Sequence, residues 1–411
     1  MIPPISSTSP LPADQWAAVR SRAIFDCCKW DVQSEDHCVL ARSPLLIDAA
    51  DWQTLATAAE RLAVEALAAE RELFHRPELH QILGLPRTIL RQLAHRDRFE
   101  PPAEACRVMR FDFHHTSDGW RLSEVNADVP GGFIEAGGFT RLVAQYLGCG
   151  TAPPDPASVY AAAISERVGT GGLVALVHAT AYSDDRQVMQ YLAAQLAKHG
   201  VRSILVSPAH LRWNSGRARI ECSFASETPD LVVRFFPGEW LPELQPRVCW
   251  INYFHSSLTF QSNPATALLI QSKRFPIAWN YLQTPLPTWR TFLPETICPS
   301  QLPRNWRGEW VLKPVFGRVG RDVGIAGITQ ENELATIARS AKRSPTEWAA
   351  QRQFDLLPIA TPDGTRFPSI GVFTVNGAAS GLYGRLARKR LIDHEAQDAA
   401  VLIRGARPEA S

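Results

Sequence analysis

Hydrophobic residues recur with a helical period near the N-terminus and in short runs of strand length from the middle of the chain onward. Between residues 53 and 75, leucines stand among alanines and charged residues at spacings that place them on one side of a helix. This pattern predicts an amphipathic helix over 53–75 with a structural role.

The segment that follows residue 171 predicts a βαβ unit. GLVALVHAT at 172–180 and VRSILVS at 201–207 are apolar runs of strand length, and the helical segment DDRQVMQYLAAQLAKHG between them ends at Gly200. A strand, a helix and a strand in this order favour parallel pairing of the two strands. DLVVRFFP at 230–237 predicts a further strand.

Later in the chain, helix-forming sequence around Pro264 to Ile270 precedes two more predicted strands. These are EWVLKPVF at 309–316 and RFPSIGVFTVNG at 366–377. The Pro/Gly-rich connector GTAPPDPAS at 150–158 is a candidate boundary between an N-terminal part and the βαβ unit. The chain is therefore predicted to be a mixed α/β protein.

Polar side chains stand in two segments that otherwise have the pattern of buried strands, within RFDFHHTSDGWRLSEVNADVPGG at 110–132. The ThrSerAspGly turn signal between the segments predicts a β-hairpin. If the aspartate of this signal is the centre of the turn, Asp112 faces Glu124 and Arg110 faces Asn126. All four then lie on one face, because side chains alternate along a strand. The opposite face is apolar and suits a core: Met109, Phe111, Phe113, Val125 and Ala127.

Two carboxylates that face each other across a strand pair repel, so their pairing needs a compensating charge. Mg²⁺ supplies one, since it prefers oxygen ligands and is usually held by one or two carboxylates plus substrate phosphates. Asp112, Glu124 and Asn126 are therefore candidate magnesium ligands, and Arg110 beside them could hold a phosphoryl oxygen. A solvated polar face on an edge hairpin is the alternative.

A second candidate site is EWVLKPVFGRVGRDVG, a strand that carries Lys313 and continues into a loop with Gly317, Gly320 and Gly324. Glycines let a backbone approach phosphates closely, and a lysine beside them neutralises charge. The segment is neither a Walker A motif nor GxGxxG, and a plain hairpin turn is the alternative. Lys273 in QSKRF is a further cation, for which a solvated surface lysine is the alternative.

Composition limits the classes of partner. With 411 residues and 45% hydrophobic residues, the chain can bury a sizeable core, and about 100–200 residues per domain predicts two to four domains. The formal net charge of +2 gives no bulk electrostatic reason to expect nucleic acid or an anionic membrane as partner. Small molecules are the expected partners, and the oligomeric state is not predicted.

The eight cysteines are scattered, with neither a CxxC pair nor a dense disulfide framework, and this favours reduced thiols. The first residues, MIPPISSTSPLPADQW, lack a basic segment followed by an apolar one, and nowhere do about 18 uninterrupted apolar residues occur. A soluble cytoplasmic protein is expected.

Taken together, these residues resemble the glutathionylspermidine synthase-like branch of the ATP-grasp ligases, over nearly the whole chain from about residue 25. The family's Arg-x-Asp followed by Glu-x-Asn-Ala-Asp is similar to the run from Arg110 to Asp128, and EAG at 135–137 is also in place. DLVVRFFPGEWL at 230–241 is similar to the family's strand that ends in Pro-x-Glu-Trp-Leu. LKPVFGRVGRDV is similar to its nucleotide loop.

The resemblance implies an ATP-grasp fold with a pre-ATP-grasp α/β domain, and only the synthetase half of bifunctional relatives. The implied domains are an N-terminal part with the magnesium-binding hairpin at 1–165, a pre-ATP-grasp domain at 166–265 and an ATP-grasp domain at 266–411. ATP and Mg²⁺ are the implied cofactors, with magnesium on the Asp, Glu and Asn of the hairpin.

The resemblance also implies roles for other positions of this chain. Arg110 would meet the reacting phosphate or carboxylate, and Arg385 in GLYGRL would be the C-terminal catalytic arginine. The residues implied to contact ATP are Lys273 and Lys313, then Gly317, Arg318 and Gly320 of the nucleotide loop, and Gln353 at the linker expected to touch adenine. Asp128 and the pair Asp184 and Asp185 are the implied substrate contacts.

Two departures from the family concern the substrates. Glutathione-using members carry small hydroxyl residues after Asn-Ala-Asp, where this chain has Val129, Pro130, Gly131 and Gly132, and this argues against glutathione as the acid. Asp184 and Asp185 replace the family's acidic pair near the amine site, and they favour a cationic amine. Support of a helix N-terminus is the alternative role for that pair.

The implied reaction is ATP-dependent joining of a small-molecule acid to a small-molecule amine, through an acyl phosphate. Two alternatives from other classes remain open. One is a catalytically silent ATP-binding regulatory protein of the same fold. The other is a metal-dependent hydrolase that uses the carboxylate face alone, whose activity would persist without nucleotide.

Overall fold

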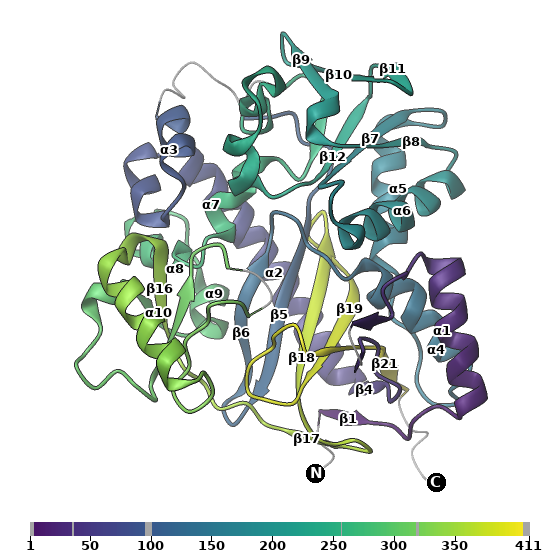
Figure 1. Cartoon of the computed structure of the whole chain (residues 1–411), viewed down its shortest axis with the longest axis vertical. Helices are drawn as coiled ribbons and strands as arrows, with labels where there is room; N and C mark the ends of the chain where they lie inside the picture. Colours follow the sequence, from purple (N-terminus) through teal and green to yellow (C-terminus); the bar gives the residue numbers. More distant parts are fainter. Residues whose placement is uncertain (1–3, 35–36, 95–100, 256, 318–319, 406–411) are drawn as a thin grey trace.

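An antiparallel sheet of six strands forms the centre of the computed structural model, which describes residues 4–34, 37–94, 101–255, 257–317 and 320–405 (Figure 1). The order is β20-β19-β18-β5-β6, and β17 pairs with β18 outside this path. The strands are β5 (Val108–Thr116), β6 (Gly119–Asn126), β17 (Ile359–Thr361), β18 (Gly364–Val375), β19 (Ala378–Ala387) and β20 (Gln397–Ala399).

The predicted hairpin is confirmed as β5 and β6, but its turn differs from the expectation. Thr116 pairs with Gly119, so the turn consists of the two residues between them instead of being centred on the aspartate. A β-bulge then shifts the register after Asp112, with Ser123 as the extra residue on β6. Because the bulge compensates for the shorter turn, Asp112 faces Glu124, and the other expected polar pair also forms.

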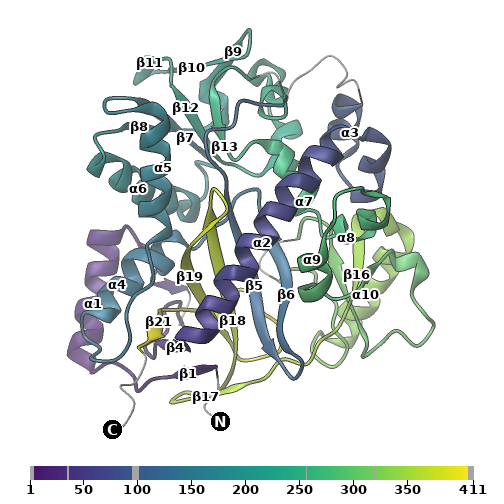
Figure 2. The ribbon, with the colours of Figure 1, turned by 180° about the vertical axis from the view of Figure 1, so that it is seen from behind.

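The two faces of the hairpin separate core from polar groups as predicted. The five residues predicted for the apolar face are each at most 4% exposed, and β5 lies inside the sheet between β6 and β18. Helix α2 (Ala49–Phe74) crosses the back of this sheet (Figure 2). The amphipathic helix predicted from residue 53 is thus confirmed and begins four residues earlier. The alternative interpretation was a solvated edge hairpin. Only β6 is an edge strand, because β5 pairs with β18 on its other side.

The predicted βαβ unit is also confirmed. Four parallel strands have the order β13-β12-β7-β8, namely β7 (Leu173–His178), β8 (Arg202–Val206), β12 (Leu231–Phe235) and β13 (Phe260–Ser262). Helices α5 (Pro156–Val168) and α6 (Ser183–Lys198) pack beside them (Figure 1). Every residue of β7 and β12 is buried, which explains their continuous apolar runs.

A smaller antiparallel sheet holds the predicted strand with Lys313. Its order is β14-β16-β15, with β14 (Thr296–Ile297), β15 (Trp310–Pro314) and β16 (Trp348–Arg352). Helix α10 (Glu331–Arg343) covers it, and Trp310, Ile337 and Trp348 belong to their shared core. The strand expected at 366–377 is β18 of the central sheet, so the parts expected at 1–165 and 266–411 meet there.

The other strands join the two ends of the chain or form small sheets. Strands β1 (Ile5–Ser7), β4 (Leu45–Asp48) and β21 (Val401–Arg404) make one sheet, β2 (Gln33–Ser34) and β3 (His37–Cys38) another, and β9 (Leu211–Asn214), β10 (Arg217–Cys222) and β11 (Ala225–Glu227) a third. Remaining helices include α1 (Ala13–Cys27), α3 (Arg87–Leu93), α4 (Thr140–Ala144), α7 (Leu268–Gln271), α8 (Phe275–Ala278) and α9 (Pro287–Phe292). Within the described ranges, no helix has the length and apolar character needed to cross a bilayer.

Candidate functional site

Arg110 and Asp112 form a tight ion pair on the polar face of the hairpin. The Nε atom of Arg110 donates to Oδ1 of Asp112 at 2.7 Å, and Nη2 donates to Oδ2 at 2.9 Å. Asn126 donates to the same Oδ2 at 2.9 Å, and Arg110 also donates to the carbonyl of Gly131 at 2.6 Å. Burial opposes the charge on Arg110, but pairing with Asp112 raises its pKa, so the guanidinium stays charged.

Glu124, the other carboxylate, lies among lysines. Lys273 Nζ is 3.2 Å from its Oε2. Burial alone would raise the pKa of Glu124, but Lys273 and Lys313 lower it below its ordinary value. Burial lowers the pKa of Lys313 to about 8, against the attraction of Glu124. Lys313 Nζ donates to Oε1 of Gln351 at 2.7 Å. Each facing carboxylate therefore has a partner cation within the chain, a compensation that the sequence reasoning assigned to a metal.

The glycine loop after β15 packs closely against its surroundings. Lys273 Nζ donates to the carbonyl of Gly317 at 2.7 Å. Gly320 has a φ of +66°, and a β-carbon there would collide with the carbonyl oxygen of Ile392. Gly317 and Gly320 line the same cavity as Lys273 and Lys313, whereas the third predicted glycine, Gly324, pairs with Leu312. Arg318, the predicted loop arginine, lies outside the described residues.

Two cavities meet at these groups. The first, of about 280 Å³, is lined by Arg110, Asp112, Tyr383 and Arg385 among others. The second, of about 130 Å³, lies on the side of the lysines. Six residues line both cavities and mark their junction: His114, Ser123, Glu124, Gly317, Gly320 and Ile392.

The second cavity has the features of a site for a planar, partly apolar group. Its walls include the apolar side chains of Val311, Val323, Ile325, Phe354 and Leu356. Gln353, predicted at the adenine, lines it, and its buried Oε1 has no hydrogen-bond partner within the described structure. Lys273 and Lys313 line the cavity too, so a nucleotide base and its phosphates could occupy one continuous space.

Arg385, the predicted catalytic arginine, lines the first cavity, and its contacts are with its own C-terminal segment. Its Nη2 atom donates to the carbonyls of Asp393 at 2.9 Å and Ala396 at 3.1 Å, and Nε is 3.6 Å from Oδ1 of Asp398. The ring of Tyr383 lies 4.8 Å from the guanidinium carbon of Arg110. Two cations and an aromatic ring thus line this cavity.

The predicted substrate contacts lie in two places, and of the three only Asp128 is among the described residues that line the first cavity. Asp128 is buried, and its carboxylate accepts hydrogen bonds from Arg234 and from the backbone N–H of Gly238, so it ties the hairpin to the βαβ unit. Asp184 and Asp185 lie in the first turn of α6, and neither is among the described residues that line the two cavities. A direct substrate contact by these three stays a prediction.

The hairpin's ligand set fits magnesium by its chemistry. Within the described ranges there is no group of three His, Cys, Asp or Glu side chains that could hold a metal alone. Two carboxylates and the amide oxygen of Asn126 would suffice for an ion that arrives with phosphate oxygens and water. Glu124 is the more accessible carboxylate, with 33% of its side chain exposed, whereas both oxygens of Asp112 already accept hydrogen bonds.

Sequence reasoning missed three residues in or near the first cavity, namely His114, Tyr383 and Lys29. His114 lies on the same face of β5 as Asp112, and burial beside Lys313 lowers its pKa to about 4, so it is neutral at physiological pH. Strand alternation could have identified His114, which is two positions after Asp112. It could also have identified Tyr383, which is two positions before Arg385. Lys29 carries no local signal, because its partners are distant in the sequence.

The chain resembles known proteins in sequence and in fold. The family model described as glutathionylspermidine synthase preATP-grasp matches residues 28–404. Among curated protein sequences, none matches. A glutathione synthetase-like effector from Globodera pallida has a similar structure, with a TM-score of 0.65 and 13% identity over 95% of this chain and 96% of that chain. At that identity the likeness concerns the fold, and it confirms the expected ATP-grasp-type α/β architecture.

A second structure, described as a gamma-glutamylcysteine synthetase from Methylobacillus flagellatus, matches with a TM-score of 0.42 and 11% identity over 82% of each chain. This likeness is too low to support an argument. The sequence match, by contrast, covers the hairpin, both lysines and the wall with Arg385. The chain therefore belongs to the glutathionylspermidine synthase preATP-grasp family.

Proposed function

We propose that this protein is an ATP-dependent carboxylate–amine ligase that forms an amide bond through an acyl phosphate. Membership in a synthetase family supports the general class of ATP-dependent ligase. The observation that carries the finer proposal is the meeting of two cavities at Glu124, with Lys273 and Lys313 on one side and Arg110 and Arg385 on the other.

The nucleotide would occupy the second cavity, with its base near Gln353. Lys273 and Lys313 would then lie beside the phosphates at the junction, and their charges would offset phosphate repulsion. Lys273 also holds the carbonyl of Gly317, so phosphate binding and the position of the glycine loop are coupled through one ammonium. Closure of that loop would keep water from a reactive intermediate.

The acid would bind in the first cavity, where Arg110 can contact its carboxylate. One carboxylate oxygen attacks the γ-phosphorus, and ADP leaves. Magnesium, when held by Glu124, Asp112 and Asn126, would neutralise phosphate charge during this transfer. Arg110 and Arg385 would stabilise the negative charge of the transferring group and of the later oxyanion.

The amine nitrogen then attacks the acyl carbon, the carbon–oxygen bond to phosphate breaks, and the nitrogen loses a proton. One oxygen of the original carboxylate consequently leaves with inorganic phosphate. This transfer tests the proposal: with an acid labelled with oxygen-18 in its carboxylate, mass analysis should find one labelled oxygen in the phosphate. Amide formation that leaves the phosphate unlabelled would exclude the acyl phosphate.

A further inference from the structure

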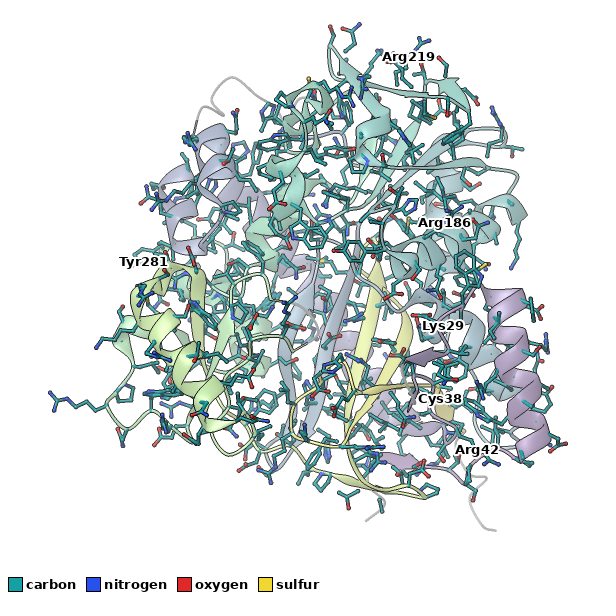
Figure 3. All side chains as sticks on the ribbon, in the orientation of Figure 1. Lys29, Cys38, Arg42, Arg186, Arg219 and Tyr281 are labelled. Carbon is teal, nitrogen blue, oxygen red and sulfur yellow. The ribbon has the colours of Figure 1, made fainter. Side chains whose placement is uncertain are left out.

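The ammonium group of Lys29 is surrounded by carboxylates close to the first cavity. Lys29, only 7% exposed, places its Nζ atom 2.7 Å from Glu135, 3.1 Å from Asp31 and 3.9 Å from Asp398. Asp184 is a further neighbour, because Asp31 and Lys29 both act on its charge. We call these five residues the Lys29 cluster. Figure 3 marks Lys29 between helix α1 and the central sheet.

The cluster touches the wall of the first cavity directly. Tyr383 donates its hydroxyl hydrogen to Oδ1 of Asp398 at 2.6 Å, while the same ring lies against Arg110. Arg385 approaches that Oδ1 atom at 3.6 Å. Tyr383 and Arg385 both line the cavity, so one layer of side chains separates Lys29 from the space where the acid would bind.

This wall is on the side of the cavity away from the nucleotide. Tyr383, Arg385 and Gly132 line the first cavity but are not among the described residues that line the second. Once nucleotide occupies the second cavity, the acyl carbon would be open to attack from the wall with Tyr383. An amine that approaches there would meet the electric field of the Lys29 cluster.

The charges of the cluster depend on Lys29. Burial raises the pKa of Asp398, and the neighbouring Glu135 raises it further, while Lys29 and Arg385 oppose the shift. Burial and Asp31 likewise raise the pKa of Asp184. Without the ammonium of Lys29, the pKa values of Asp398 and Asp184 would rise further, and a replacement cation in the cage would oppose that rise.

We propose that Lys29 determines the amine specificity of this protein, by supplying internally the cation that this acidic cage would otherwise take from a substrate. The inference rests on the proposed ligase function. It names the substrate class as an amine without a second positive charge. It also departs from the expectation of a cationic amine, which considered Asp184 and Asp185 without the neighbouring Lys29.

A binding experiment tests the cage without any turnover. Lys29→Ala removes the ammonium and leaves space flanked by carboxylates, so n-butylammonium chloride should raise the melting temperature of this variant saturably. Equal concentrations of sodium chloride or n-butanol should not. Wild type and Lys198→Ala, which removes an exposed lysine at the end of α6, should show no such rescue. Rescue by n-butanol as strong as by the ammonium, or no rescue of a folded variant, would overturn the proposal.

An activity comparison then tests specificity. Phosphate release with ATP and a pool of acids is measured with n-butylamine and with 1,4-diaminobutane, which differ by one ammonium group. In Lys29→Ala the KM of the diamine should fall by about tenfold or more relative to that of the monoamine, with a smaller change in kcat. An unchanged ratio of the two KM values would contradict the proposal, since a merely structural loss would affect both amines equally.

If Lys29→Ala does not fold, Lys29→Met takes its place in the activity comparison. This variant keeps the length of the side chain and removes its charge. Lys29→Arg should retain the wild-type preference. Absence of phosphate release with every acid and amine would remove the ligase proposal, whereas the melting experiment would still decide whether the cage takes a cation.

Discussion

Glu124 is the residue at which both cavities, both lysines and the predicted metal site meet. Glu124→Gln keeps the shape of the side chain and removes its charge. Turnover at saturating magnesium should fall by roughly a hundredfold, because a ligand of the ion is lost. ATP affinity measured without magnesium should stay equal or increase, since Lys273 and Lys313 lose a competing anion.

The matched control is Glu331→Gln, which removes an exposed carboxylate at the start of α10 and should leave both quantities unchanged. Wild-type turnover in Glu124→Gln would exclude Glu124 from the metal site. Weaker ATP binding without magnesium would show instead that the variant disturbs the lysines.

The lowered pKa of Lys313 predicts that nucleotide binding is linked to proton uptake. Burial holds its pKa at about 8 in the free protein, below the ordinary value. Phosphates favour the charged form and raise this pKa, so ATP binding near pH 8 to 9 should take up a proton, and ATP affinity should decrease as pH rises through that range. Calorimetric titration without magnesium, in two buffers of different ionisation enthalpy, measures the uptake.

Lys313→Arg provides the comparison, because an arginine stays charged across this range and should bind ATP without proton uptake. Heats that do not depend on the buffer in the wild-type protein would contradict the assignment of Lys313 to the phosphates.

At the scale of elements, the glycine loop depends on close backbone contact. A β-carbon at Gly320 would collide with the carbonyl oxygen of Ile392, and the φ of +66° adds strain. Gly320→Ala should therefore lower stability by more than about 1 kcal/mol and weaken ATP binding, measured by thermal unfolding and titration. Gly327→Ala is the matched control, because its φ of +78° is similar but its surroundings are open. Equal effects of both variants would show that the contact with Ile392 is unimportant.

The hairpin shows how far an element follows from its own sequence. Alternation predicted both faces, and the pairing of Asp112 with Glu124 is confirmed. The bulge at Ser123 could not be predicted, because turn and bulge are alternatives with similar local patterns. The partner cations were missed for another reason: Lys273 is brought to Glu124 by packing of distant segments, which no local pattern encodes.

At the scale of the whole molecule, the site combines segments from both ends of the chain. The hairpin and the strand with Arg385 meet in one sheet through β18, while Lys313 comes from a separate small sheet. The resemblance to a family predicted this assembly, whereas pattern and composition alone predicted only its parts. The placement of Asp128 and the Lys29 cluster required the structure, since both depend on long-range ion pairs.

Which acid the protein uses also depends on the whole molecule. After Asn126, the carbonyl of Gly131 accepts a hydrogen bond from Arg110, and a β-carbon at Gly132 would lie 3.0 Å from the ring of Tyr383. Hydroxyl donors of the kind that glutathione-using relatives carry are absent from this stretch of sequence. The purified protein should therefore form no glutathionylspermidine from glutathione, spermidine and ATP. Efficient synthesis of that product, detected by mass spectrometry, would contradict this prediction.

The central claim is that ATP hydrolysis is coupled to joining an acid to an amine. The most direct measurement is phosphate release from ATP over pools of acids and amines, with mass detection of the condensed product. The ligase proposal predicts phosphate and amide in equal amounts, only when ATP, an acid and an amine are all present. Nucleotide binding without phosphate release in any mixture would favour a regulatory protein. Cleavage of an added ester or amide in the absence of nucleotide would favour a hydrolase, and either result would contradict the proposal.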